Sequence, residues 1–418
     1  MKFVIIGSGP TALGAAFRLY ELIENGSIPS ETEVLIVEKE RDVGGLARSV
    51  TDDRGFTWDL GVHITGASKY IKFTNTINTL VDAWNVIPRR VKAYMAHVTE
   101  DGQNVVEDYV PYPVQNSIPY FKEEMKKRCL EELSQLPTVV SHKNFGEFTR
   151  DTFGESLQKE FIRPYNEKVW TVKLEEMNTA WVANRVPRPE VGNLRRRCDL
   201  SIEQLQEEEN KEKQLFKYPK KLKGAGEMWR LLASRLPAHW FKFNCELQRV
   251  DPVQKKVFIR NNRYTTYSHL ISTMSIVELG KASGLLLESK LKHSKVVLVG
   301  VGVRTPQPEC TFISNFNERL TPNPVLYWSM ICEIGLPADA TVDEQELIDK
   351  TILDLRQHGL LDEENQVIHR WIHVLPLGYP IPTVDRDEEL RTAHQTLEKH
   401  SIFSRGRSVY PGKQKNPV

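Results

Sequence analysis

The residues best suited to chemistry are small ones near the amino terminus, in the run GSGPTALG at 7–14. Apolar residues before it predict a buried strand over 3–6, and residues 15–23 have the apolar spacing of a helix. A glycine-rich turn between strand and helix lets the backbone and the helix amino terminus bind a pyrophosphate. A second predicted strand, 33–37, ends at Glu38, which is suited to accept from ribose hydroxyls. The pattern predicts a dinucleotide site.

Each small residue of this turn has its own expected role. Gly7 permits the tight turn, Gly9 lets the phosphates approach, and Ala12 fills the third small position. Gly14 is expected to keep the helix close to the sheet. A tight β–α turn without a ligand is the alternative, but the strand, the helix and the distal acid all agree with a nucleotide site.

The next two segments decide between FAD and NAD. GGLARSV at 44–50 and FTWDLGVHI at 56–64 resemble segments of FAD enzymes in the amine-oxidase and protoporphyrinogen-oxidase group. The resemblance implies that Arg48 reaches the flavin pyrophosphate and that Gly61 and His63 lie beside the isoalloxazine ring. The glycines of the first segment, Gly44 and Gly45, belong to the same expected cofactor site. FAD is therefore the expected cofactor.

The middle of the chain is rich in aromatic and cationic side chains. In YVPYPVQNSI at 109–118 the prolines exclude a central strand, and Tyr112 and Gln115 are suited to contact a base. In 161–189, RPYNEKVW and AWVANRV combine tryptophan, tyrosine and arginine, which suit stacking on uracil and pairing with phosphate. A plain loop and a packed amphipathic bundle explain the same residues nearly as well.

Taken together, these segments resemble eukaryotic-type UDP-galactopyranose mutases over residues 1–407. The further segments that carry the resemblance are LISTM, VGVGVR, YWSMICEI and GYPIPTVDRD. It implies interconversion of UDP-galactopyranose and UDP-galactofuranose by reduced FAD, through an adduct between flavin N5 and the sugar. The product would serve the synthesis of galactofuranose glycans of a cell wall or glycocalyx.

The resemblance also implies roles for individual residues. Those assigned to catalysis are His63, Arg185 and Tyr379. Those assigned to the substrate are Tyr112 and Gln115 at the uridine, and Asn166 and Trp170 at the sugar and phosphate. NADH or NADPH would reduce the flavin, with Arg89 and Arg90 near the nicotinamide nucleotide; a solvated basic pair is the alternative.

The chain departs from this family in four places. The charged run 201–223 stands where the family has a mobile, neutral loop that closes on substrate; a solvated helix or hinge is the alternative. Val62 replaces a glycine, and its Cβ is expected to disturb the flavin loop. Between Arg304 and Tyr327 the aromatic residues and the second pyrophosphate arginine of the family are missing. After Arg407 the family's last tyrosine and flavin-binding helix do not follow. The alternatives are a catalytically impaired or inactive truncated form and an FAD-dependent amine oxidase-like oxidoreductase.

Composition limits the remaining classes. The formal net charge is +1, so no broad field favours nucleic acid or an anionic membrane. The five cysteines form no C-x-x-C pair, which indicates neither a zinc site nor a disulfide framework. The sequence contains no run of about 18 apolar residues, so no membrane span is predicted. We expect a cytoplasmic protein without a metal, acting on a small molecule and able to form a homo-oligomer.

The expected fold is α/β: a Rossmann-like FAD-binding domain with a helical bundle and an antiparallel β-sheet substrate domain. The FAD-binding parts are 1–90, 224–300 and 375–407, and the resemblance implies that a hairpin in the second part brings the Leu247 backbone near adenine. The substrate sheet comprises 90–118 and 300–375. The other expected segments are a helical domain at 119–200, a charged loop or linker at 201–223 and a disordered tail at 408–418.

Overall fold

The computed structural model describes residues 1–63, 70–99, 109–136, 142–182, 188–211, 215–260, 263–286, 288–305 and 326–406. The chain forms two compact units: unit 1 is Met1–Val86, Lys217–Lys292 and Asp385–Val418, and unit 2 is Ile87–Phe216 and His293–Val384. Arg185, the segment 306–325 and the tail 408–418 lie outside the described residues. Among the described helices, none has the length and apolar character needed to cross a bilayer.

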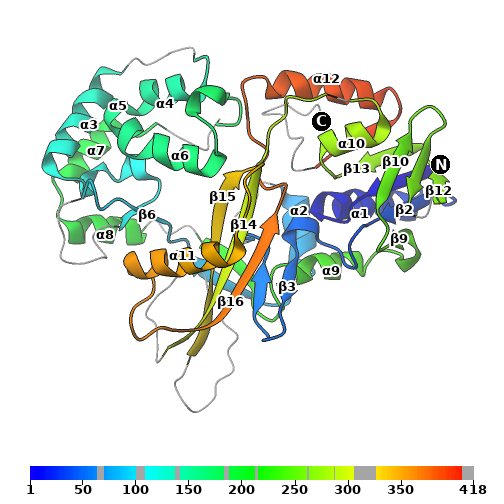
Figure 1. Ribbon diagram of the computed structural model, residues 1–418, viewed down its shortest axis with the longest axis horizontal. Helices are drawn as coiled ribbons and strands as arrows, with labels where there is room; N and C mark the ends of the chain where they lie inside the picture. The colour runs from blue at the N-terminus through cyan, green and yellow to red at the C-terminus, as the bar shows by residue number, and fades with distance from the viewer. Residues whose placement is uncertain are drawn as a thin grey trace. The chain divides into compact units, whose positions relative to one another are not determined.

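Unit 1 is built on a five-stranded parallel sheet with the order β17–β13–β1–β2–β9 (Figure 1). The strands are β1 Lys2–Ile6, β2 Glu33–Val37, β9 Phe241–Lys242, β13 His269–Ser272 and β17 Ile402–Ser404. The chain leaves β1 toward β2 on one side and reaches β13 on the other, so the strand order reverses beside β1. The carboxyl ends of strands at such a point form the usual ligand crevice of α/β sheets.

Helices cover this sheet on both faces. The helices are α1 Pro10–Glu24, α9 Glu227–Ala233, α10 Ile276–Ser283 and α12 Arg386–Glu398. Val4 and Ile6 of β1 share one apolar cluster with Leu279 of α10 and Leu390 of α12. Figure 1 shows α10 and α12 on the same side of this sheet. Side chains alternate along a strand, so Ile5 points to the other face, and it is also fully buried. Burial on both faces explains the continuous apolar run of β1.

Smaller elements complete unit 1. These are η1 Gly45–Ala47, β3 Ser49–Thr51, β4 Thr57–Asp59, α2 Ile71–Asn78, η6 Ala238–Trp240, β10 Leu247–Asp251, β11 Lys256–Ile259 and β12 Arg263–Thr266. β3 and β4 form an antiparallel hairpin, and β10, β11 and β12 form a three-stranded antiparallel sheet. The two-stranded sheet of β5 Trp84–Pro88 and β8 Leu215–Pro219 contains two of the points where the chain passes between the units.

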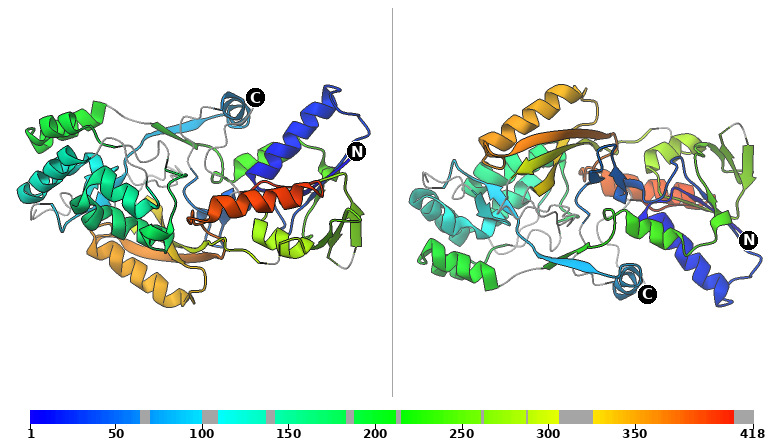
Figure 2. Two further views of the ribbon diagram at one scale, coloured as in Figure 1. Left: turned by 90° about the horizontal axis from the view of Figure 1, so that it is seen from above. Right: turned by 90° about the horizontal axis from the view of Figure 1, so that it is seen from below.

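Unit 2 contains an antiparallel sheet with β14 Ser294–Thr305 between β15 Leu326–Pro337 and β16 Gln366–Leu375. Alternate valines of β14 are fully buried: Val297, Val299, Val301 and Val303. They pack with Ile348 and Ile352 of α11 Glu344–Gln357, which lies along that face (Figure 2). The opposite face carries Gly300 and Gly302, and in β15 it carries Glu333, the register partner of Leu298.

The helices of unit 2 enclose a second core. They are α3 Glu123–Gln135, α4 Phe145–Phe153, α5 Glu155–Leu157, α6 Arg163–Trp170, α7 Val191–Cys198 and α8 Ile202–Lys211. Shorter pieces are β6 Lys92–Tyr94, β7 Tyr109–Pro111, η2 Val114–Asn116, η3 Ile118–Tyr120, the π-helical turn η4 Gln158–Ile162 and η5 Leu174–Glu176. The charged segment 201–223 thus begins with a helix. Leu205 of α8 is fully buried, and Glu208 and Glu209 pair with Arg196 and Arg197 of α7.

With its parallel sheet, helical region and antiparallel sheet, the structure confirms the predicted α/β fold class. The first three elements also agree with their sequence patterns. A run of apolar residues forms β1, the helical spacing lies within α1, and β2 has the bounds that its β-branched residues predict.

Candidate functional site

Two glycine-containing turns meet at the carboxyl end of β1. Gly9 ends the turn that leads into α1, and Gly44 and Gly45 lie in the turn that follows β2. A Cβ on Gly45 would lie 3.1 Å from the Cα of Gly9, so the two backbones are almost in contact. The N–H of Gly44 donates to the carbonyl oxygen of Ser8 at 2.9 Å. The two predicted glycine motifs therefore form one backbone cradle, which would be filled by side chains if either turn carried them.

The other small residues of the first turn differ in their surroundings. Gly7 has φ of +94°, and a Cβ there would collide with the side chain of Thr273, so the turn requires glycine. Ala12 is fully buried, as its small size predicts. Gly14 is exposed, and a Cβ would meet no atom within 4 Å. The prediction that Gly14 holds the helix against the sheet is wrong, because α1 turns its Ala12 side toward the core.

Glu38 lies 6% exposed at the end of β2 and ties the first turn in place. Its Oε2 accepts from the N–H of Ser8 at 2.8 Å and from the Ser8 hydroxyl at 2.7 Å. Its Oε1 accepts from the N–H of Glu40 at 2.9 Å. A buried carboxylate needs such donors to offset its lost hydration. In this structure Glu38 thus holds the cradle, and an additional contact to a ribose remains a prediction.

The cradle presents donors to an anion. The first turn of α1 has Gly9 as its N-cap, with no side-chain cap and no acidic residue, so its N–H groups and the positive end of its dipole face the turn. Arg48 follows η1, and its Nε is buried with no hydrogen-bond partner in the described residues. One of its terminal nitrogens lies 3.3 Å from Glu40. An unpartnered guanidinium nitrogen beside an uncapped helix fits a phosphate group.

A buried polar network fixes β3, the strand that directly follows Arg48, and sequence reasoning missed it. Asp59 of β4 is 9% exposed and accepts from the hydroxyl of Ser49, from the Tyr218 hydroxyl at 2.8 Å and from the Ala225 N–H at 3.1 Å. The Ser49 hydroxyl in turn accepts from the Gly226 N–H at 2.7 Å. An acid within the otherwise apolar stretch TWDL was the available signal. Its partners lie far along the chain and could not be named from the sequence.

His63 lies in the same part of unit 1 as the cradle. Its Nε2 is 2.7 Å from the carbonyl oxygen of Leu46 and 3.1 Å from that of Leu60, so Nε2 carries a proton and donates. Gly61 adopts φ of +120°, which places this loop next to the His63 ring. Val62 is 58% exposed and lies outside the left-handed region. At Val62 itself the backbone therefore shows none of the strain that a valine in place of glycine predicts.

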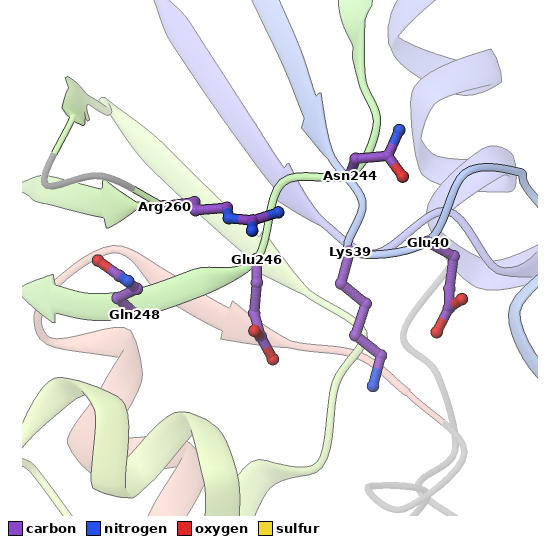
Figure 3. Close-up of a pocket in the computed structure, with 6 residues that line it drawn as sticks. All are labelled: Lys39, Glu40, Asn244, Glu246, Gln248 and Arg260. Atoms are coloured by element: carbon purple, nitrogen blue, oxygen red, sulfur yellow. The ribbon is translucent and has the colours of Figure 1, made fainter.

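A polar pocket of about 410 Å³ lies beside the carboxyl ends of β2 and β9. It is lined by Lys39, Glu40, Asn244, Glu246, Gln248 and Arg260. Lys39 and Glu246 extend in the same direction from neighbouring segments (Figure 3). The pocket follows Glu38 in the chain, and Leu247 lies between two of its lining residues at the start of β10. Lining residues of the pocket are therefore direct chain neighbours of Glu38 and Leu247, the two residues predicted to lie at the adenosine end of the cofactor.

Unit 2 brings together aromatic residues from three distant segments. The rings of Tyr112 after β7 and Tyr165 of α6 lie 6.1 Å apart between centroids. Trp170 at the end of α6 lies 6.1 Å from the ring of Tyr379, which follows β16. The Tyr379 hydroxyl donates to Oε1 of Glu333 on β15 at 2.5 Å. We call these five residues the aromatic cluster. Glu333 was not predicted, although its segment YWSMICEI was recognised.

Two glycines of unit 2 let the cluster assemble. A Cβ on Gly335 of β15 would lie 3.2 Å from the carbonyl oxygens of Lys168 and Val169, so α6 packs directly on that strand. A Cβ on Gly378 would lie 2.5 Å from Cγ2 of Val296. The Gly378 N–H donates to the carbonyl oxygen of Ser294 at 2.8 Å. The N–H of Ser294 donates to the carbonyl oxygen of Tyr379 at 2.8 Å. The Tyr379 backbone is therefore locked to β14.

Replacing Gly378 with alanine is expected to destabilise the protein by about 1–3 kcal/mol, since the added methyl group overpacks the contact with Val296 and Ser294. Thermal unfolding followed by circular dichroism measures the effect. The matched control is Gly14→Ala on the open side of α1, which should stabilise by up to about 1 kcal/mol by raising helix propensity. Equal effects at both positions would contradict the close packing at Gly378.

The other predicted residues of unit 2 have distinct surroundings. Asn166 of α6 donates from Nδ2 to the carbonyl of Ile162 at 2.7 Å, next to the π-helical turn η4. Gln115 is 5% exposed, so most of its side chain is buried. Arg163 pairs with Glu175 at 2.6 Å and with Glu167 at 2.9 Å. The hydrogen bond from Arg163 to Glu175 holds the pKa of Glu175 below its usual value. Arg163 therefore connects α6 to η5.

Comparisons with known proteins show the family and the fold to which the chain is similar. The family of flavin-containing amine oxidoreductases matches residues 20–298. Among solved structures, a reduced UDP-galactopyranose mutase is similar with a TM-score of 0.81 and 29% identity, covering 97% of this chain and 88% of that chain. A cyclohexylamine oxidase from Brevibacterium oxydans is similar with a TM-score of 0.60 and 12% identity. The match covers 98% of this chain and 93% of that chain. A CLA-producing fatty acid isomerase from P. acnes has a TM-score of 0.58 and 16% identity, with 98% and 94% covered.

Proposed function

The chain belongs to the family of flavin-containing amine oxidoreductases, and we propose that within this family it is a UDP-galactopyranose mutase. It would interconvert UDP-galactopyranose and UDP-galactofuranose with reduced FAD. The observation that carries the proposal is the aromatic cluster of unit 2, in which RPYNEKVW on α6 meets the GYP turn after β16. Similarity to a mutase over 97% of this chain supports it.

The residues of unit 1 fit FAD. The cradle of Gly7, Gly9, Gly44 and Gly45 leaves backbone open to a pyrophosphate, and the buried Nε of Arg48 lacks a partner that a phosphate oxygen would supply. Glu38 and the Leu247 backbone would face the adenosine half, while Gly61 and His63 would lie beside the ring. Reduced FAD would supply the electron pair that displaces UDP from the anomeric carbon.

In unit 2 the chain's own residues would bind and orient the nucleotide-sugar. Tyr112 and Gln115 would contact the uridine, and Asn166 and Trp170 the sugar and phosphate. Tyr379 and Arg185 would contact the diphosphate, where negative charge accumulates as UDP departs. Each contact would act mainly by positioning, because the bond chemistry belongs to the cofactor. NADH or NADPH is the proposed reductant, with Arg89 and Arg90 as candidate contacts.

An assay with chemically reduced flavin tests this proposal. The purified protein should show flavin absorbance and convert UDP-galactofuranose to UDP-galactopyranose when dithionite is present. Under air and without a reductant, conversion should stop, because the oxidised flavin lacks the electron pair. The two sugars are separated and measured by anion-exchange chromatography. A flavin-loaded protein with no conversion under reducing conditions would reject the mutase proposal.

The family match favours a second candidate, an FAD-dependent amine oxidase-like oxidoreductase. Such an enzyme would consume oxygen when supplied with an amine, without any added reductant. The two candidates are therefore separated by the same protein preparation, with an oxygen electrode and a panel of primary amines. Oxygen uptake that depends on the amine would favour the oxidase.

A further inference from the structure

A carboxylate lies inside the part of unit 2 that the proposed function assigns to an anion. Glu333 accepts a hydrogen bond from the Tyr379 hydroxyl at an oxygen–oxygen distance of 2.5 Å. A phenol carries a single proton and can donate it to one acceptor at a time. The distance is typical of a hydrogen bond to an ionised carboxylate, which is about twice as strong as a neutral one. In this structure, the Tyr379 hydroxyl therefore donates its hydrogen bond to Glu333.

The surrounding contacts hold this pair in place. The Tyr379 backbone is hydrogen-bonded to Ser294, which fixes the point from which its ring extends. Glu333 lies two residues before Gly335, where α6 packs on β15 and brings Tyr165 to the cluster. Burial, together with the nearby Tyr112, Tyr379 and Glu333, raises the pKa of Tyr165 to about 12. Among these causes the charge of Glu333 is the smallest, and burial is the largest.

We propose that Glu333 lowers the affinity of the diphosphate site for anions. Its carboxylate competes with the diphosphate for the hydrogen bond that the Tyr379 hydroxyl donates. The proposal rests on the proposed function, which puts a nucleoside diphosphate at Tyr379. Two anions cannot share the one phenolic proton, and their charges repel each other at short range. Binding of the diphosphate therefore requires the Glu333 side chain to release Tyr379. Glu333 weakens the resting affinity for UDP and keeps the nucleotide exchangeable.

The test compares Glu333→Gln with the unchanged protein by calorimetric titration of UDP and of uridine. Glutamine keeps the shape and an acceptor oxygen but removes the charge. UDP should bind about three- to tenfold more tightly to the variant, whereas neutral uridine should bind equally to both proteins. A purely structural role would change the two affinities together. An unchanged or weakened UDP affinity would overturn the proposal.

The matched control is Glu344→Gln, which removes the same charge from the first turn of α11 on the other face of the sheet. Its UDP affinity should equal that of the unchanged protein. In a Tyr379→Phe background the gain from Glu333→Gln should shrink, because no proton is contested. An equal gain in both backgrounds would reduce Glu333 to a general charge effect and overturn the competition. If UDP binds to none of the proteins, the proposed function itself fails, and the inference with it.

Discussion

Replacing Asp59 with alanine is expected to destabilise the protein by about 3–5 kcal/mol and to release the flavin, because the buried donors around it lose their acceptor. The hydroxyl of Tyr218 and the N–H of Ala225 would be left unsatisfied, and Ser49 would lose its partner. Ser49 directly follows Arg48, so loosening β3 also misplaces the arginine proposed for the pyrophosphate. Thermal unfolding and the ratio of flavin to protein absorbance measure the two effects.

The control for Asp59 lies in the same hairpin. Asp53→Ala removes the same charge from an exposed position between β3 and β4 and should leave both readings almost unchanged. Asp59→Asn keeps one acceptor oxygen and should lose less stability than the alanine variant. If Asp59→Ala unfolds at the same temperature as the unchanged protein and keeps its flavin, the network does not support the cofactor site.

Replacing Arg48 with methionine is expected to lower flavin affinity by about 10- to 100-fold, the value of one hydrogen bond between charged groups. Folding stability should change little, since the Nε of Arg48 has no partner among the described residues and methionine keeps most of the apolar stem. The ion pair with Glu40 is partly exposed and contributes little. Titration of the apoprotein with FAD, followed by quenching of flavin fluorescence, gives the affinity.

Two variants sharpen the Arg48 experiment. Arg54→Met removes a charge from the exposed turn of the β3–β4 hairpin and should bind FAD normally. Arg48→Lys keeps the charge but not the planar donor set, and should therefore recover only part of the affinity. A methionine variant with normal FAD affinity would remove Arg48 from the cofactor site.

Much of the dinucleotide unit could be predicted from the sequence because its signals are local. β1, α1 and β2 follow from apolar periodicity, and Gly7 follows from a turn geometry that other residues resist. Gly14 shows the limit of such a motif. Its spacing matches a packed position, but spacing does not state which neighbour a helix side meets, and in the structure it meets none.

The sequence alone thus determined the α/β class, the glycine turns and the residue types available for an FAD and nucleotide-sugar site. The tertiary structure decided which of these residues meet. Tyr379 and Glu333 are 46 residues apart and Asp59 and Tyr218 are 159 apart, so no local pattern pairs them. They meet because backbone hydrogen bonds and close packing at glycines bring distant segments together. Such contacts depend on the whole fold, which is why Glu333 and Asp59 emerged only with the structure.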